Sequence, residues 1–451
     1  MPAPSASWRE PPVASPRASR SIPPMRCAAL VLLAPLLAGC PSPVVQPSFD
    51  AGPLPDGGIA HPCALPGSLQ FTSAGTVAVP GGPPGLPGLA FLHLPVGFCA
   101  HAFGSVPNAR QLRFAPGGEL FVASPTTGTT GGGQGGLAQI LVLPDDDRNG
   151  VADANLTFLA ALPSTQGLLF ANDALYYQDA TRILRVAYHP GDRVPSAASA
   201  LVADISAYTS PLHWPKTLDV ADDGHIYVGN GGDQGEICAE PHPVHGGIVE
   251  LDGTPGGNPI VRGLRNPIAV RCARGHDRCF ALELAKDYTA GQGGREKLVP
   301  IRAGDDWGFP CCATQGLPYQ DTTTGDGGVP DCAQVAAEDN SFLIGDTPFG
   351  VDFEPGRWPG TWAGRAFVAT HGAAGTWTGA RIVGIPLDPT TGLPTPSTNT
   401  GGSDQGMSDF ATGWDDGSQA HGRPAALAFS DDGRLFVAND TLGVIFWIAP
   451  M

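Results

Sequence analysis

The chain has 451 residues, a formal net charge of −17 at pH 7 and a hydrophobic content of 42%. Gly (62) and Pro (47) are abundant whereas only 15% of the residues are charged, which is typical of many short strands joined by tight turns. The strong negative charge excludes nucleic acid as a partner, because the surface would repel its phosphates. Only three lysines occur, Lys216, Lys286 and Lys297, so any anionic ligand must rely on arginine.

The N-terminal part of the sequence is typical of an exported protein. Residues 25–40 combine a basic residue, Arg26, with an apolar run at 28–38 and a Leu-Ala-Gly-Cys tetrad that ends at Cys40. The tetrad resembles a lipobox, in which the cysteine is acylated and becomes the mature N-terminus; the alternative is a buried apolar helix. We expect residues 1–40 to contain an export signal, with the true start of translation at Met25. We expect residues 41–60 to be a flexible tether. Through the lipid on Cys40, its only link to a membrane, the protein would lie on the bacterial cell envelope, facing the periplasm or the exterior.

Eight cysteines remain outside this signal, and an even count in an exported protein predicts disulfides. They are Cys63, Cys99, Cys238, Cys272, Cys279, Cys311, Cys312 and Cys332. Their spacings match no zinc motif. We expect four bridges, among them Cys272–Cys279, which would clamp one loop. For Cys311 and Cys312 two alternatives stay open: a strained vicinal bridge, or bonds to two separate loops carrying Cys238 and Cys332.

One sequence unit recurs six times: a turn with Gly or Asp, then a short apolar strand with a central aromatic residue. The aromatic residues are Phe121, Tyr176, Tyr227, Phe280, Phe367 and Phe436. The first four lie roughly fifty to fifty-five residues apart, close to the length of one four-stranded blade. The pattern predicts an all-β fold, a six-bladed β-propeller, as a single domain over residues 61–451. The wider gap between Phe280 and Phe367 should supply long loops over one mouth of the ring.

A histidine precedes the turn of the third unit. His213 begins the segment His-Trp-Pro-Lys-Thr-Leu, which is followed by the turn, by Tyr227 and by a Gly-Asp pair ending at Asp233. At this place His213 would face the central channel, where an imidazole with an ordinary pKa near 6.5 suits a general base. Taken alone, such a histidine is more often structural, so the neighbouring motifs decide its interpretation.

Further motifs precede three other units. Gln166 begins a Gln-Gly-Leu-Leu segment before the second, Arg265 and Asn266 belong to a Gly-Leu-Arg-Asn-Pro segment before the fourth, and Arg423 lies in a His-Gly-Arg-Pro segment before the last. Arginine suits a ligand with several carboxylates, because its planar fork binds them through two hydrogen bonds.

In this order, over roughly residues 106–448, the motifs resemble those of the quinone-dependent soluble glucose/sorbosone dehydrogenases. The resemblance implies oxidation of an aldose or a related sugar alcohol or aldehyde, with hydride transfer to pyrroloquinoline quinone. It implies His213 as general base, with Asp233 placed to orient or stabilise the imidazolium, and Arg265 as the group that stabilises developing negative charge. The implied cofactor-binding residues are Gln166, Asn266 and Arg423.

The chain departs from that family at two points. Residues 293–298 stand where an acidic pair and an asparagine usually help to hold the calcium of the cofactor, and no lysine follows Lys297, although some members hold the quinone with a late lysine. These departures favour an alternative, a propeller that binds a partner or a polysaccharide without chemistry. A second alternative is a calcium-dependent lactonase on a similar ring, which needs acidic and asparagine ligands lining the channel.

The segment DDDRNGVAD at residues 145–153 forms a motif independent of this resemblance. Oxygen ligands at alternate positions, with Gly150 for the sharp turn, fit a calcium loop. The expected ligands are Asp145, Asp147, Asn149, the carbonyl of Val151, and Asp153. We expect a structural calcium there; the alternative is an acidic turn without metal.

Overall fold

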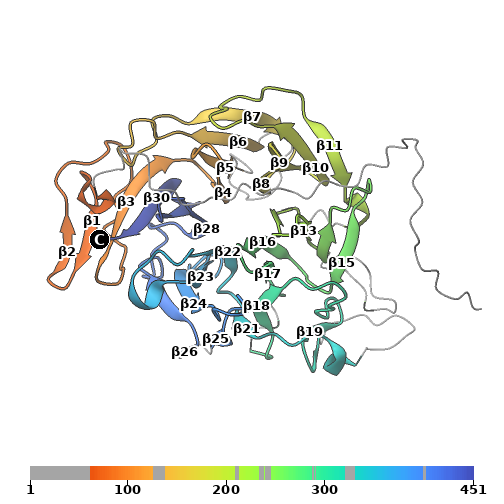
Figure 1. Ribbon diagram of the computed structural model, residues 1–451. Coiled ribbons are helices and arrows are strands. Elements are labelled where there is room, and N and C mark those ends of the chain that lie inside the picture. The colour runs from red at the N-terminus through yellow and green to blue at the C-terminus, as the bar shows by residue number, and fades with distance from the viewer. Residues whose placement is uncertain are drawn as a thin grey trace, which may run out of the picture. The chain divides into compact units, whose positions relative to one another are not determined.

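The computed structural model describes residues 61–124, 138–208, 213–232, 238, 245–286, 289, 291–319, 331–399 and 403–451. Their strands form six main sheets, in which neighbouring strands are antiparallel except for the parallel pair of β21 and β25, and these sheets stand around a common centre (Figure 1). The protein is a six-bladed β-propeller, as predicted. Among the described residues no helix has the length and apolar character needed to cross a membrane. Cys40 and the expected tether lie outside the described residues.

Four blades have four strands each, and the first strand of every blade lies innermost. They are β4 (Gln111–Phe114), β5 (Leu120–Ser124), β6 (Ala138–Leu143) and β7 (Leu156–Leu162); β8 (Leu168–Ala171), β9 (Ala174–Asp179), β10 (Arg182–Ala187) and β11 (Ala200–Asp204); β12 (Leu218–Val220), β13 (Ile226–Asn230), β14 (Gly247–Glu250) and β15 (Asn258–Arg262); and β22 (Pro348–Phe353), β23 (Arg365–Thr370), β24 (Arg381–Pro386) and β27 (Ser408–Ala411).

A fifth blade lies between the third and fourth of these along the chain and carries the insertions. It contains β16 (Pro267–Ala273), β17 (Arg278–Glu283), β18 (Arg295–Pro300), β21 (Asn340–Leu343), β25 (Ser397–Asn399) and β26 (Asp404–Gln405). The segment between β18 and β21 forms a small hairpin of β19 (Cys312–Thr314) and β20 (Leu317–Pro318) and a short 3-10 helix, η4 (Cys332–Gln334). This is the long irregular gap that the sequence placed between the fourth and fifth units.

The last blade closes the ring by joining both ends of the propeller. Its strands are β28 (Pro424–Phe429), β29 (Leu435–Asn439), β30 (Val444–Pro450), β3 (Phe98–Ser105), β1 (Leu69–Thr72) and β2 (Gly75–Ala78). β3 pairs antiparallel with β30, from Phe98 opposite Pro450 to Ser105 opposite Val444. The Cys63–Cys99 disulfide fastens the 3-10 helix η1 (Pro62–Ala64) to β3 beside this closure.

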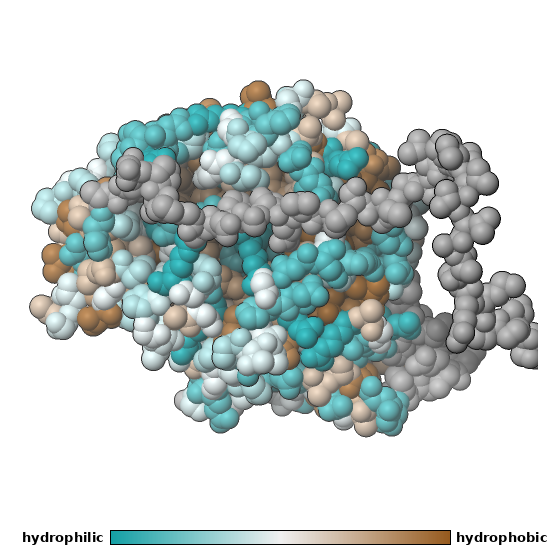
Figure 2. Space-filling view, in the orientation of Figure 1, coloured by the Kyte–Doolittle hydropathy of each residue, from teal (hydrophilic) through white to brown (hydrophobic). Residues whose placement is uncertain are grey.

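The six aromatic residues of the repeat all lie on the second strand of a blade. Five of them are at most 4% exposed, and Tyr227 is half-buried. Phe121, for example, packs edge to face against Phe158 at 5.1 Å and Phe170 at 4.8 Å, the second of which belongs to the next blade. The core therefore lies between neighbouring blades, while the surface shown in Figure 2 is largely hydrophilic, with scattered apolar patches.

Four disulfides are present, as predicted. Cys272–Cys279 joins facing residues of β16 and β17. Cys238–Cys311 and Cys312–Cys332 settle the open alternative, because the two adjacent cysteines bond to two separate loops. These two bridges, with the hairpin and η4, fasten the insertion.

The order of the strands defines two mouths of the ring. We call the end where the loops enter the six first strands the upper mouth, and the end where the turns join first to second strands the lower mouth. The first strands contact one another in ring order, β4, β8, β12, β16, β22, β28 and back to β4. Residues just before these strands therefore gather at the upper mouth.

Candidate functional site

The predicted site residues occupy equivalent positions in different blades. Gln166 lies just before β8, His213 is in the loop that enters β12, Arg265 and Asn266 immediately precede β16, and Arg423 immediately precedes β28. All therefore lie at the upper mouth, and the blades of Gln166 and of Arg265 flank the blade of His213 on either side in ring order. Arg423 belongs to the blade opposite that of His213. Asp233 lies outside the described residues.

Three of these residues are held by the same backbone interaction. A side-chain oxygen at or near the end of a second strand accepts a hydrogen bond from the backbone N–H of the site residue. The pairs are Gln178 Oε1 with Gln166 at 3.0 Å, Glu283 Oε1 with Arg265 at 2.9 Å, and Asn439 Oδ1 with Arg423 at 2.7 Å. The repeat thus carries a polar residue that fixes each loop where it enters the mouth.

His213 and Arg265 are linked through the backbone of one glycine. The carbonyl of Gly232 accepts a hydrogen bond from His213 Nδ1, and its N–H donates to the carbonyl of Arg265 at 2.8 Å. Since a carbonyl only accepts, Nδ1 carries the proton in the neutral imidazole and Nε2 has the lone pair that can take up a proton. A Cβ at Gly231 would lie 2.2 Å from that of His213, and one at Gly232 would lie 2.7 Å from Phe309, so both positions need glycine.

Lys216, which the sequence analysis did not assign to the site, fastens the loop of His213. Its Nζ donates to the carbonyls of His213 at 2.9 Å, Trp214 at 3.1 Å and Pro215 at 3.4 Å, and its side chain is 1% exposed. Gln178 accepts from the N–H of Lys216 at 2.9 Å and donates to the Trp214 carbonyl at 2.7 Å. Burial lowers the pKa of Lys216 to about 7, while the carbonyl acceptors favour the charged amine.

Arg265 is supported by a buried charge pair, Glu283 and Lys297, that the sequence motifs did not indicate. Its Nη1 donates to the carbonyl of Ala285 at 2.7 Å, while Glu283 pairs with Lys297 Nζ at 2.8 Å. Lys297 also donates to the carbonyl of Ala313 at 2.9 Å, and both charged side chains are 1% exposed. The sequence feature that could have indicated this support is Glu283, the acidic residue that ends the strand of the fourth repeat unit.

Several buried polar atoms at this mouth have no hydrogen-bond partner among the described residues, and four of them belong to the segments just before β8 and β16. They are Thr165 Oγ1, Gln166 Oε1, Arg265 Nε and Asn266 Oδ1. They come from the two blades that flank the blade of His213. Because buried polar groups in native proteins are nearly always paired, such a cluster indicates a polar ligand that supplies both donors and acceptors.

Arg423 already uses part of its hydrogen-bonding capacity within the protein. Nε donates to the carbonyl of His371 at 2.6 Å, Nη2 donates to that of Gly372, and the guanidinium lies 4.4 Å from the ring centre of Trp377. Burial lowers its pKa to about 10. Its predicted contact with a cofactor remains a prediction.

A buried charged pair lies beside Arg423. Asp440 Oδ2 is 3.0 Å from His371 Nε2 and accepts from Arg110 Nε at 3.2 Å. Burial lowers the pKa of His371 to about 4, and the interactions with His371 and Arg110 hold the pKa of Asp440 well below its usual range despite its burial. These groups satisfy one another, unlike the four atoms described above.

The predicted calcium loop joins β6 to β7 and lies at the lower mouth. Side-chain oxygens of Asp145, Asp147, Asn149 and Asp153 accept hydrogen bonds from backbone N–H groups of the same loop, at 3.2, 3.1, 2.8 and 2.7 Å. In the described ranges no group of three or more His, Cys, Asp or Glu side chains is arranged to hold a metal ion. The oxygens thus shape the turn, and calcium at this loop, including the carbonyl of Val151, remains a prediction.

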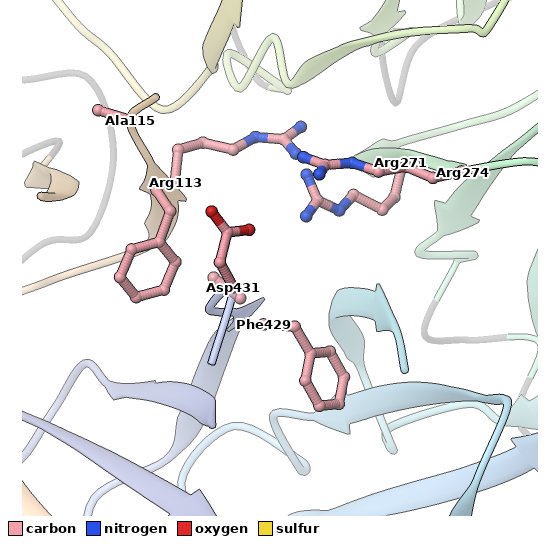
Figure 3. A pocket seen from close by; sticks show the side chains of 8 residues that line it. Arg113, Ala115, Arg271, Arg274, Phe429 and Asp431 are labelled. Carbon is pink, nitrogen blue, oxygen red and sulfur yellow. The ribbon is translucent and has the colours of Figure 1, made fainter. Parts of the chain in front are cut away.

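The channel toward the lower mouth is crossed by ion pairs. Arg271 of β16 donates to both carboxylate oxygens of Asp352 of β22 at 2.8 Å and lies 3.4 Å from Asp219 of β12. Arg113 of β4 lies 3.2 Å from Asp219. Figure 3 shows the guanidinium groups of Arg113, Arg271 and Arg274 converging here.

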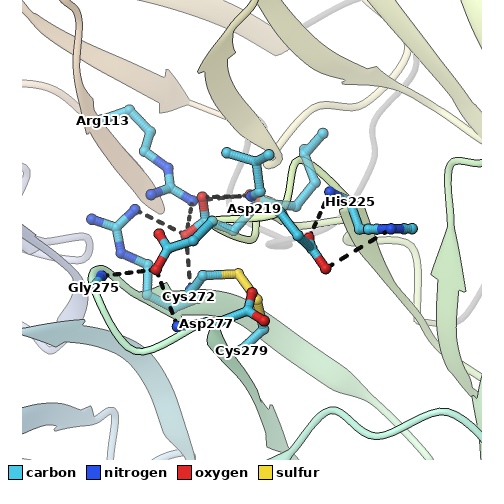
Figure 4. The surroundings of a disulfide bond; sticks show 12 residues. Arg113, Asp219, His225, Cys272, Gly275, Asp277 and Cys279 are labelled. Atoms are coloured by element: carbon cyan, nitrogen blue, oxygen red, sulfur yellow. Dashed lines mark hydrogen bonds and ion pairs between the residues drawn. A yellow bond between two sulfur atoms is a disulfide. The ribbon is translucent and has the colours of Figure 1, made fainter. Parts of the chain in front are cut away.

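Backbone groups extend this network to every first strand. Arg113 donates to the carbonyls of Leu168 in β8 and Leu218 in β12, both at 2.9 Å, and the N–H of Phe429 in β28 donates to Asp352 at 2.8 Å. Asp219 also accepts from the N–H of Cys272 at 3.0 Å, beside the Cys272–Cys279 disulfide (Figure 4). The network therefore ties all six blades together at the centre.

Comparison with protein families gives one match, a domain of unknown function (DUF7133) over residues 89–253. A search of curated proteins gave no match to this sequence.

Comparison with solved structures supports the propeller fold. The chain is similar to the iodide structure of a carbohydrate-active enzyme of family AA12 from Trichoderma reesei, with a TM-score of 0.62 and 19% identity over 80% of this chain and 98% of that one. It is also similar to the holo form of the pyranose dehydrogenase PQQ domain from Coprinopsis cinerea, with a TM-score of 0.61 and 18% identity over 81% of this chain and 98% of that one. A third similar structure is the soluble aldose sugar dehydrogenase from Escherichia coli in its apo form, with a TM-score of 0.55 and 12% identity over 78% of this chain and 100% of that one.

Proposed function

We propose that the upper mouth binds pyrroloquinoline quinone and a sugar, and that the protein oxidises an aldose or a related sugar alcohol or aldehyde. The observation that carries this proposal is the link between the two predicted catalytic residues: Gly232 joins His213 and Arg265 directly. The fold that the chain shares with sugar dehydrogenases is consistent with it.

The residues of the mouth fit a quinone that bears carboxylates. Gln166, Arg265 and Asn266 each hold a buried polar atom without a partner among the described residues, so a polar ligand there would satisfy them rather than displace existing hydrogen bonds. These residues, with Arg423 across the ring, would hold the cofactor. When bound, the quinone supplies an acceptor for the hydride that leaves the sugar carbon.

His213 would remove the hydroxyl proton of the sugar at Nε2. Its Nδ1–H is occupied by the Gly232 carbonyl, which keeps the basic lone pair on the other nitrogen and stabilises the imidazolium once it forms. The proton goes to His213 and the hydride to the acceptor, so the C–OH carbon becomes a carbonyl carbon. Arg265 is 7% exposed as a whole residue. Its guanidinium would stabilise the negative charge that develops on oxygen.

The test is reduction of an artificial electron acceptor by the purified protein with pyrroloquinoline quinone, calcium and a panel of aldoses. His213→Ala should lower turnover by roughly a hundredfold or more and leave quinone binding, followed by absorbance titration, largely intact. Arg265→Ala should weaken both. His189→Ala, at an exposed site on another blade, should change neither. If the unmutated protein neither binds quinone nor reduces the acceptor with any sugar, the enzymatic proposal is wrong.

A non-catalytic binding propeller is the second candidate. It is favoured by the internal hydrogen bonds of Arg423 and by the lack of a lysine after Lys297. The same assay separates the two candidates, because a binding module would retain sugar or polysaccharide and show no quinone-dependent turnover.

We further propose that the mature protein is anchored to the cell envelope by lipid on Cys40, on the strength of the sequence around it. Mass spectrometry of the membrane fraction should find an acylated N-terminal peptide beginning at this cysteine. An unacylated mature protein that begins elsewhere would contradict the anchor.

A further inference from the structure

A second cavity lies at the lower mouth, on the other side of the ring from His213. It has a volume of about 430 Å³ and lies between the closing blade and the blade of β4 to β7. Three aromatic side chains, Phe103, Phe114 and Phe436, form part of its wall. This size is typical of pockets that bind small molecules, and the wall combines the aromatic side chains with charged ones.

Two buried polar atoms in this wall lack partners among the described residues. Arg434 is 9% exposed, and its Nη1 has no acceptor, although its Nε and Nη2 pair with Asp432. Asp145 Oδ1 is buried and accepts no hydrogen bond. The charge of Arg434 acts on Asp145, yet the two side chains form no ion pair. Both residues line the cavity, and each carries one buried polar atom without a partner among the described residues.

The charges of the wall determine which ligand fits. Four carboxylates, those of Glu119, Asp145, Asp146 and Asp432, outnumber two arginines, Arg148 and Arg434, among the lining residues, so a carboxylate or phosphate would be repelled. A simple cation would leave Arg434 Nη1 unsatisfied. A neutral ligand with neighbouring hydroxyl groups satisfies both atoms, because one hydroxyl can donate to Asp145 while the next accepts from Arg434. Its C–H surface could lie against the phenylalanine rings.

We propose that this lower cavity binds a neutral saccharide, held by hydroxyl hydrogen bonds to Asp145 and Arg434 and by contact with Phe114. The site is separate from the upper mouth and does not depend on the proposed oxidation. Its saccharide would be retained rather than oxidised, because His213 and Arg265 lie at the other end of the channel.

The test is calorimetric titration of the full chain, without quinone and with a chelator so that calcium does not occupy Asp145. The probes are glucose, mannose, N-acetylglucosamine and maltose. At least one should bind saturably, and Arg434→Met should weaken its binding about tenfold or more, because the variant removes the buried donor but keeps an unbranched stem against Phe436. Arg365→Met is the matched control: that arginine lies over Trp362, 5.1 Å from its ring centre, in another blade, and its loss should leave the affinity unchanged.

A second variant guards against misfolding of the first. Phe114→Trp narrows the cavity at a half-buried position and should also weaken binding, with an unchanged melting temperature as the check on folding. Absence of saturable binding for all four sugars overturns the proposal. So does binding that neither Arg434→Met nor Phe114→Trp weakens, which would place the sugar at the upper mouth. Either result leaves the proposed oxidation to its own assay.

Discussion

Two groups of buried polar residues, one toward each end of the channel, differ in whether their partners lie within the protein. Toward the lower mouth, Arg113, Asp219, Arg271 and Asp352 satisfy one another and the backbone of all six first strands. At the upper mouth, side chains of the same depth keep unpaired atoms, among them those of Gln166 and Asn266. The first group thus uses buried charge to close the ring, and the second leaves hydrogen-bonding capacity for a ligand.

This difference separates two kinds of buried polar residue that look alike in sequence. A residue whose partners lie in the protein contributes to stability, and its loss leaves a charge or dipole unsatisfied. A residue whose partner is a ligand lowers stability in the free protein and is maintained by function. Substitutions at the two ends should therefore give opposite patterns of stability and binding.

The largest effect is expected at the lower mouth. Arg271→Met removes the cationic partner of Asp352 and one of the two arginines beside Asp219, so the carboxylate of Asp352 is left buried without its ion pair. The free energy of unfolding should fall by about 3–5 kcal/mol, measured by urea denaturation. The control is Arg278→Met, at an exposed position of the same mouth, which should cost about 0.5 kcal/mol or less. Equal losses in the two variants would mean that the network does not close the ring.

A smaller effect on stability is expected from the hydrogen-bonded pair of His371 and Asp440 at the upper mouth. Burial lowers the pKa of His371 to about 4, below its ordinary 6.5, so the folded state binds fewer protons than the unfolded state between these values. The contribution of the neutral His371 to the free energy of unfolding is therefore complete above pH 6.5. It is lost as the pH falls toward 4, by at most about 3 kcal/mol.

The measurement is urea denaturation of the wild type and of His371→Gln across this range. The wild type should lose stability more steeply than the variant as the pH falls. Parallel curves for the two proteins would show that His371 does not become protonated on unfolding.

The Cys272–Cys279 disulfide should contribute less than the ion pairs beside it. It closes a short loop of sequence separation 7, so replacing both cysteines by alanine should lower the free energy of unfolding by about 2 kcal/mol. Thermal and urea unfolding with intact and substituted chains measure this, and a free-thiol count on the unfolded, unreduced wild type should be near zero. A loss larger than that of Arg271→Met would reverse the ranking.

The smallest change in stability should come from the unsatisfied residues. Asn266→Ala should alter the free energy of unfolding by about 0.5 kcal/mol or less, because its buried oxygen has no partner among the described residues to lose, while quinone affinity should fall about tenfold. Asn439→Ala is the matched control, since that side chain bonds Arg423 and the carbonyl of His421 at 2.7 Å each; it should cost about 1–3 kcal/mol. Similar losses in both would contradict the comparison.

The sequence contained enough to predict the ring because each blade repeats one local pattern. The aromatic residues, from Phe121 to Phe436, fall on second strands without exception, and the position of a segment before a first strand was sufficient to place Gln166, Arg265 and Arg423 at one mouth. Local order decides these features, so no long-range contact had to be known.

The supporting residues could not be predicted in this way. Glu283 and Lys297 meet because they face each other across β17 and β18, and the pair of Arg271 and Asp352 joins two blades. Such contacts depend on strand register and on packing between blades, which a single sequence does not specify. Lys216 was missed for a similar reason, because its acceptors are backbone carbonyls of its own loop rather than residues with a recognisable type.

All three lysines of the chain are enclosed, with Lys216 and Lys297 1% exposed and Lys286 6% exposed. Reducing sugars condense with accessible primary amines to form Schiff bases, the first step of glycation. The folded propeller therefore offers a reducing sugar no exposed lysine amine. The same feature means that amine-directed labels and cross-linkers should modify the folded propeller poorly, and should react with its lysines only after unfolding.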